Sequence, residues 1–172
     1  MSNMSHTPAD ASIQLSPPQL SFLFEARIAL HDEVLDIGQY PGGHRSVYLI
    51  KGGQFAGPAI RGEVIADSGG DWVRETPDGT LHLDVRLVLR TDDGALIYVT
   101  WRGRFWAEPE EREHALDLHK PDIGPQPESF YFRTAVEFEV SDPRYAWLNR
   151  TLAVGTSRLA DGSAIHRVFS LE

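Results

Sequence analysis

The sequence predicts an all-β fold, an antiparallel barrel or sandwich with one or two short helices. Through most of the 172 residues, apolar and polar side chains alternate with a period of two, which is the pattern of strands with one buried face. Turns rich in glycine, proline and aspartate separate these runs at regular spacing, as is typical of barrels and sandwiches. The chain is long enough to bury a sizeable core, so we expect a single domain over residues 19–172.

The elements at the start of the chain follow from this alternation. Residues 1–18 are polar and end in Pro17 and Pro18, so we expect a flexible N-terminal arm. Residues 19–30, "QLSFLFEARIAL", predict the first strand. The residues expected to share its apolar face are Leu20, Phe22, Phe24, Ala26, Ile28 and Leu30.

Further strands are expected in "HRSVYLIKGG" and "PAIRGEVI", arranged around turns at Gly52 and Gly53 and at Gly57 and Pro58. The stretch "SGGDW" predicts a tight loop. "FYFRTAVEFEV" predicts another strand, and "TLAVG" and "AIHRVFSL" predict a last pair joined through Asp161 and Gly162.

Two segments have the signals of short helices. In residues 108–120, Pro109 stands at a plausible first helical position, acidic residues fill the first turn and Lys120 comes at the end. In residues 142–150, Asp142 is expected to cap one or two helical turns.

Residues 82–105 predict a hairpin whose register depends on its turn. A loop of only Asp93 and Gly94 pairs Leu87 with Thr100 and mixes apolar with polar partners on one face. A three-residue loop that begins at Asp92 avoids this, and a slip of one residue costs about 1.5–3 kcal/mol for each large side chain exposed. We therefore expect the pairs Leu89 with Ile97, Leu87 with Val99, Val85 with Trp101, Val88 with Tyr98, Arg86 with Thr100, Asp84 with Arg102 and His82 with Arg104.

This register separates two faces but does not say which face points inward. The polar face can simply meet solvent, or it can line the interior of a small barrel that holds a ligand.

Three separated blocks resemble one known family. They are "GGQFAGPAIRGEVIADSGGDW", "LDVRLVLRTDDGALIYV" and "YFRTAVEFEVSDPRYAWLN", and they occur in order over nearly the whole chain from Leu20. The sequence is similar in these blocks to the domain of unknown function 3237 family. The resemblance implies a calycin-like, lipocalin-like antiparallel β-barrel, often seen as a homo-oligomer, and it implies little about chemistry.

The candidate catalytic residues are Asp71, Arg86, Arg133 and Tyr131. A carboxylate at a barrel mouth, with its pKa raised by the indole of Trp72, is suited to acid–base chemistry, although Asp71 can equally cap the turn formed by the two glycines before it. Arg86 and Arg133 could hold negative charge, and Tyr131 could donate a hydroxyl hydrogen. The structural alternative is a surface ion pair with Asp84 across the strands for Arg86, and a solvated strand face for Tyr131 and Arg133.

Further side chains are candidates for contacts with a substrate. His44, after two glycines, is either a proton shuttle or an exposed loop residue, and Trp147 with Asn149 suggests a lid over one barrel end. The full set of substrate-binding candidates is Trp72, Asp84, Tyr98, Arg102, Trp147 and His44. No metal and no cofactor are expected, because His114 and His119 lie five residues apart and no phosphate-cradling loop precedes a helix.

Composition narrows the functional classes. The net charge of −9 disfavours nucleic acid and anionic membranes as partners. The absence of cysteine excludes disulfides, thiolate catalysis and sulfur-ligated metals. Neither a secretory signal nor an apolar run of membrane-spanning length occurs, so a cytoplasmic location is expected.

Three functions remain open. The first is a metal-independent acid–base enzyme of the lyase, isomerase, cyclase or hydratase type, acting on a small, partly aromatic carbonyl or carboxylate compound. The second is a lipocalin-like binding protein for a small apolar ligand, whose barrel interior would then be the aliphatic face of the hairpin. The third is a homo-oligomeric building block, because exposed aromatic strand faces need covering.

Overall fold

The computed structural model of the chain describes residues 16–124 and 129–172, so the arm expected at residues 1–18 lies almost wholly outside the described residues. The described chain forms an antiparallel sheet of nine strands with two short helices, as predicted. The strands are β1 (Leu20–Tyr40), β2 (Gly43–Ala56), β3 (Arg61–Val64), β4 (Gly70–Glu75), β5 (Leu81–Thr91), β6 (Leu96–Ala107), β7 (Phe130–Val140), β8 (Ala153–Ala160) and β9 (Ser163–Leu171).

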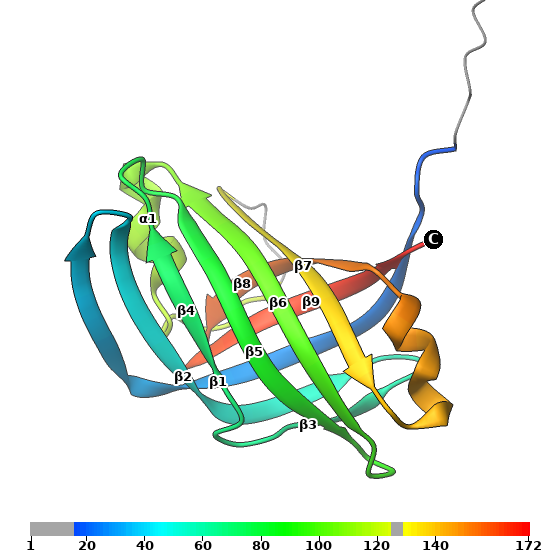
Figure 1. Cartoon of the computed structure of the whole chain (residues 1–172). Coiled ribbons are helices and arrows are strands. Elements are labelled where there is room, and N and C mark those ends of the chain that lie inside the picture. Colours follow the sequence, from blue (N-terminus) through cyan, green and yellow to red (C-terminus); the bar gives the residue numbers. More distant parts are fainter. Residues whose placement is uncertain (1–15, 125–128) are drawn as a thin grey trace, which may run out of the picture.

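The sheet closes on itself into a barrel (Figure 1). From β1 the strands follow in the order β9, β8, β7, β6 and β5, and β5 then pairs with both β3 and β4. These two short strands pair in turn with successive parts of β2, and β2 returns to β1. Closure gives the barrel an inner and an outer face, so the side chains of every strand alternate between core and surface.

The β5–β6 hairpin has the predicted register. All seven expected pairs are present, including Val85 with Trp101 and Asp84 with Arg102. Gly94 has a φ of +91°, the left-handed conformation that the three-residue loop requires. The aliphatic face of this hairpin points into the barrel, because Leu87, Leu89 and Val99 are fully buried in the core.

The first strand is longer and less regular than predicted. A register shift between Phe22 and Phe24 reverses the alternation, so Leu23 and Phe24 are both buried. Leu20 and Phe22 therefore lie on the surface, and the prediction that they share the face of Phe24 was wrong. Such a bulge adds one residue to one strand and exchanges the two faces beyond it.

Two predicted loops are parts of strands. Gly52 and Gly53 lie inside β2, opposite a second irregularity of β1, and do not form a turn. The stretch predicted as a tight loop enters β4 at Gly70, so Asp71 and Trp72 are strand residues that point to opposite faces.

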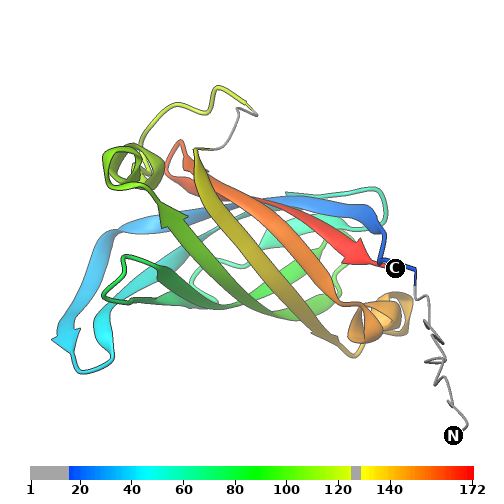
Figure 2. The same cartoon turned by 90° about the horizontal axis from the view of Figure 1, so that it is seen from above.

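The two helices cover opposite ends of the barrel (Figures 1 and 2). The helix α1 (Pro109–Leu116) begins with proline as predicted. The 3₁₀ helix η1 (Pro143–Arg150) is capped by Asp142, whose side chain accepts a hydrogen bond from the backbone N–H of Arg144. At the η1 end, Leu148 is fully buried in the core and Asn149 bonds both backbone groups of Val140.

The buried side chains form two clusters along the barrel axis. The larger one fills the middle and the η1 end around Phe24, Leu87 and Trp101. The smaller one lies under α1 around Phe105 and Phe132. The space between these clusters is the cavity described below.

Gly53 provides a test of the β1–β2 geometry. A Cβ atom at this position would collide with the backbone oxygen of Arg27, and the φ of Gly53 is +155°. We expect Gly53→Ala to lower the free energy of unfolding by about 3 kcal/mol or more, measured by urea denaturation. Gly94→Ala is the matched control, because its added Cβ would meet no atom within 4 Å. It should cost only about 1–2 kcal/mol. Equal losses in the two variants would contradict the packing of β1 on β2.

Candidate functional site

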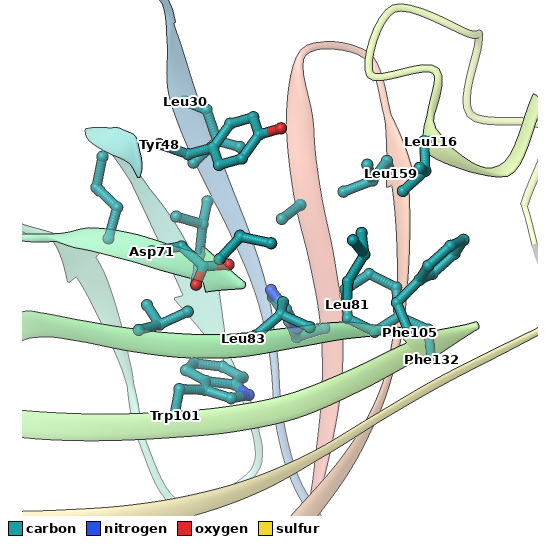
Figure 3. A pocket seen from close by; sticks show the side chains of 16 residues that line it. Leu30, Tyr48, Asp71, Leu81, Leu83, Trp101, Phe105, Leu116, Phe132 and Leu159 are labelled. Carbon is teal, nitrogen blue, oxygen red and sulfur yellow. The ribbon is translucent and has the colours of Figure 1, made fainter. Parts of the chain in front are cut away.

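A cavity lies inside the barrel towards the α1 end, and Figure 3 shows the 16 side chains that line it. Its volume is about 90 Å³, whereas about 10–15 Å³ is enough for one water molecule, so it has room for several waters or an equally small group. Most of its wall is aliphatic or aromatic. The titratable side chains among the lining residues are Tyr48, Asp71 and His166.

The wall is built from inward-facing positions of the strands. Leu83 and Val85 of β5 and Trp101 and Phe105 of β6 come from the aliphatic face of the hairpin. Leu116 of α1 completes the wall at the end of the barrel. The hydrophobic effect explains this orientation, because each buried large apolar side chain stabilises the fold by about 1.5–3 kcal/mol.

Asp71 projects its carboxyl group into this apolar space (Figure 3). The side chain is on β4 and its residue is only 9% exposed. Oδ1 accepts a hydrogen bond of 3.0 Å from the backbone N–H of Asp84, and Oδ2 has no partner within residues 16–124 and 129–172. Burial raises the pKa of Asp71 to about 7, although the Asp84 N–H bond acts in the opposite direction. A carboxyl group with this pKa can both donate and accept a proton near neutral pH.

Tyr48 stands beside Asp71, since the two residues are direct partners in the β2–β4 ladder. Burial, together with the charge of Asp71, raises the pKa of the Tyr48 hydroxyl above its ordinary value of 10.0. The hydroxyl therefore keeps its proton and can act as a hydrogen-bond donor at the cavity wall.

His166 forms another part of the wall, from β9. Its Nδ1 lies 2.6 Å from the Oγ of Ser157 on β8, and both residues are 3% exposed. The imidazole packs on the indole of Trp101, with ring centroids 4.5 Å apart. Burial lowers the pKa of His166 to about 3, so the ring is neutral at physiological pH.

The structure does not bring the other predicted catalytic residues to this cavity. Arg86 lies on the outer face of β5, next to Asp84, with its guanidinium 6.0 Å from the ring of Trp72. Tyr131 is 52% exposed on the outer face of β7. Arg133 lies on the same face, over the Tyr131 ring. The expected convergence of Arg86, Arg133 and Tyr131 with Asp71 inside the barrel is therefore not found, because closure buries the aliphatic face instead.

The predicted substrate-binding residues also lie outside the cavity wall. Trp72, Asp84, Tyr98 and Arg102 occupy outer positions of β4, β5 and β6. Trp147 packs against the core at the η1 end, and His44 bonds the Oδ1 of Asp36 through Nε2 at 2.6 Å. The indole of Trp72 does not cause the raised pKa of Asp71, since strand alternation places it on the opposite face.

Sequence reasoning missed Tyr48, His166 and Ser157. The sequence feature that could have identified them is a polar side chain at a strand position where the alternation predicts an inward-facing residue. His166 lies between Ala164 and Val168 on such a face, and Tyr48 precedes Ile50 by two residues. A buried polar group needs a partner, so residues of this kind are worth nominating.

Within the described part of the chain, no group of three or more histidine, aspartate or glutamate side chains is arranged to hold a metal ion. The same residues contain no helix that is long and apolar enough to cross a membrane.

The fold and the cavity define a class of protein, an antiparallel β-barrel with a small internal cavity whose polar groups are few. A family model described as "Protein of unknown function (DUF3237)" matches residues 18–171. The chain therefore belongs to the DUF3237 family, as the resemblance of the three sequence blocks predicted.

Individual relatives agree with this assignment. A UPF0311 protein of Rhodopseudomonas palustris is 34% identical over 137 residues, which cover 79% of this chain and 84% of that protein. A crystal structure of a beta-barrel like protein from Acinetobacter baumannii superposes with a TM-score of 0.79 at 30% identity, over 94% of this chain and all of the other. A protein of Penicillium herquei named "Hydroalkoxylation enzyme phnH" is 29% identical over 141 residues, 82% of this chain and 75% of that protein.

The buried carboxyl group makes a prediction about stability and pH. In the unfolded chain Asp71 ionises near its ordinary pKa of 3.8, whereas in the folded protein it keeps its proton until about pH 7. Its ionisation therefore opposes folding increasingly as the pH rises from about 4 to 7. Relative to wild type, Asp71→Asn should gain free energy of unfolding over this range, by at most about 4 kcal/mol.

The measurement is urea denaturation of both proteins across this pH range, compared as a difference. The difference is needed because His166, with its lowered pKa, makes the wild-type protein less stable as the pH falls below 6.5 and so masks the contribution of Asp71. A difference that does not change with pH would mean that Asp71 ionises normally.

Proposed function

We propose that the protein is an acid–base enzyme that adds an O–H group across a carbon–carbon double bond of a small, neutral, largely apolar substrate, or catalyses the reverse elimination. The observation that carries this proposal is the carboxyl group of Asp71, which is buried in an apolar cavity and has a pKa of about 7. The similarity to a relative named as a hydroalkoxylation enzyme supports the same type of chemistry.

The reaction needs one proton donor that also takes a proton back. The protonated Asp71 carboxyl gives its proton to one alkene carbon, and a hydroxyl oxygen forms a bond to the other. That oxygen then loses its proton to the Asp71 carboxylate, which restores the starting state. A carboxyl group that has a pKa near the working pH suits both transfers.

The surroundings of Asp71 fit this role. The backbone N–H of Asp84 fixes Oδ1, which leaves Oδ2 towards the substrate. The apolar wall excludes water, which would otherwise compete for a cationic intermediate. The arginines on the outer face do not contact the cavity. The cavity therefore suits a neutral substrate, and not the carboxylate compound that the sequence also allowed.

The test uses small aryl alkenols, 2-allylphenol and 2-(2-methylallyl)phenol, whose ring closure gives a cyclic ether. In deuterium oxide the product should carry one deuterium on carbon. We expect Asp71→Asn to lower the rate roughly 10²-fold or more. Glu63→Gln, an exposed carboxylate on β3, is the matched control and should keep the wild-type rate. Equal turnover by wild type and Asp71→Asn would refute the role of Asp71.

A second function is favoured by a specific observation. The aliphatic face of the β5–β6 hairpin forms the interior, as expected for a carrier of a small apolar ligand. The same panel distinguishes the two functions. Tight binding of these compounds without turnover by the wild-type protein would support the carrier.

A further inference from the structure

We propose that the Ser157–His166 pair is a recognition site for a carbonyl-type oxygen, to which the Nε2–H of His166 donates a hydrogen bond. This inference deepens the proposed function, because it names one chemical group of the molecule that occupies the cavity. It rests on this cavity being the working site, but it does not require Asp71 to transfer a proton.

The imidazole is held in one orientation from several sides. The Oγ of Ser157 lies 2.6 Å from Nδ1, and the two residues are partners in the β8–β9 ladder. The ring also packs against Trp101 and, edge to face, against Phe132 at 6.1 Å between centroids. A ring fixed in this way presents the same edge to the cavity in every molecule.

The partner of Nδ1 determines which nitrogen carries the hydrogen. The hydroxyl group of Ser157 is buried and needs an acceptor. Its partner within the described chain is the Nδ1 of His166, so the hydroxyl donates and Nδ1 accepts. In a neutral imidazole the hydrogen then resides on Nε2.

This Nε2–H group has no acceptor in the part of the chain that the structure describes. No hydrogen bond from Nε2 is found within residues 16–124 and 129–172, although His166 lines the cavity. The Nε1–H of Trp101, on the adjoining wall, is buried and has no partner among the same residues. Unpartnered buried donors are uncommon in native proteins, and a bound molecule is one way to satisfy them.

The chemistry of this wall favours a carbonyl oxygen among the possible acceptors. The ring is uncharged because burial keeps its pKa low, so the wall offers a hydrogen bond and no positive charge for an anion. A ligand hydroxyl bound here would also bring a hydrogen, for which neither the Nε2–H of His166 nor the Nε1–H of Trp101 is an acceptor. A carbonyl oxygen accepts without this cost.

A matched pair of ligands tests the proposal, namely 4-fluoroacetophenone and 4-fluoro-α-methylstyrene. They differ only in C=O against C=CH₂, and binding of each is followed by ¹⁹F NMR titration. The quantity measured is the ratio of the affinity for the ketone to the affinity for the alkene. We expect His166→Phe to lower this ratio roughly threefold to tenfold, which is the loss of one hydrogen bond.

Three further variants make the result specific. His166→Gln keeps an N–H donor near the position of Nε2 and should retain most of the ratio. Glu63→Gln changes an exposed carboxylate on β3 that does not line this cavity, and it should leave the ratio unchanged. Ser157→Ala frees Nδ1 and should lower the ratio in part, and it serves as the test if thermal melting shows that His166→Phe does not fold.

The proposal is overturned if the ratio is the same in wild type and His166→Phe, or in wild type and Ser157→Ala where the first variant does not fold. It is also overturned if neither compound binds the wild-type protein. A ratio that depends on His166 while Asp71→Asn keeps full turnover would support this site and refute the proposed role of Asp71. If Asp71→Asn loses turnover while His166→Phe keeps the wild-type affinity ratio, the role of Asp71 is supported and the Ser157–His166 site is refuted.

Discussion

The cost of placing charge in an apolar enclosure governs the chemistry of this barrel. Asp71 and His166 face the same cavity, and burial shifts both towards their uncharged forms, the acid upward in pKa and the base downward. Below about pH 7 the cavity therefore contains polar groups with little charge. Such a site suits neutral molecules, and it lets a carboxyl group hold a proton that it would lose in water.

Much of the fold follows from the sequence because apolar pairing decides it. The register of the β5–β6 hairpin was predictable, since one arrangement alone keeps Leu87 opposite Val99 and Val85 opposite Trp101. The bulge near Phe22 was not, because it depends on how β1 meets β9. The turn predicted at Gly52 and Gly53 was wrong because it, too, depends on contacts between strands. Glycine serves both turns and places where two backbones approach closely, and only the assembled barrel distinguishes them.

The candidate site was predictable in one part. Asp71 was nominated as an acid or base and lies in the cavity, whereas Arg86 and Arg133, nominated with it, lie on the outer face. Alternation separates two faces without saying which is inside, and here burial of aliphatic side chains decided it. His166 was not nominated, because strand alternation places it on the face opposite Ile165 and Arg167 without saying which face is inside.

The plug of η1 has a practical consequence. Leu148 and the paired bonds of Asn149 close one end of the barrel, and the cavity lies towards the other end, where Arg112 ties α1 to Glu75 and Gly79. The C-terminus lies beside η1 (Figures 1 and 2), so a tag or surface linkage attached there is remote from the α1 end, towards which the cavity lies.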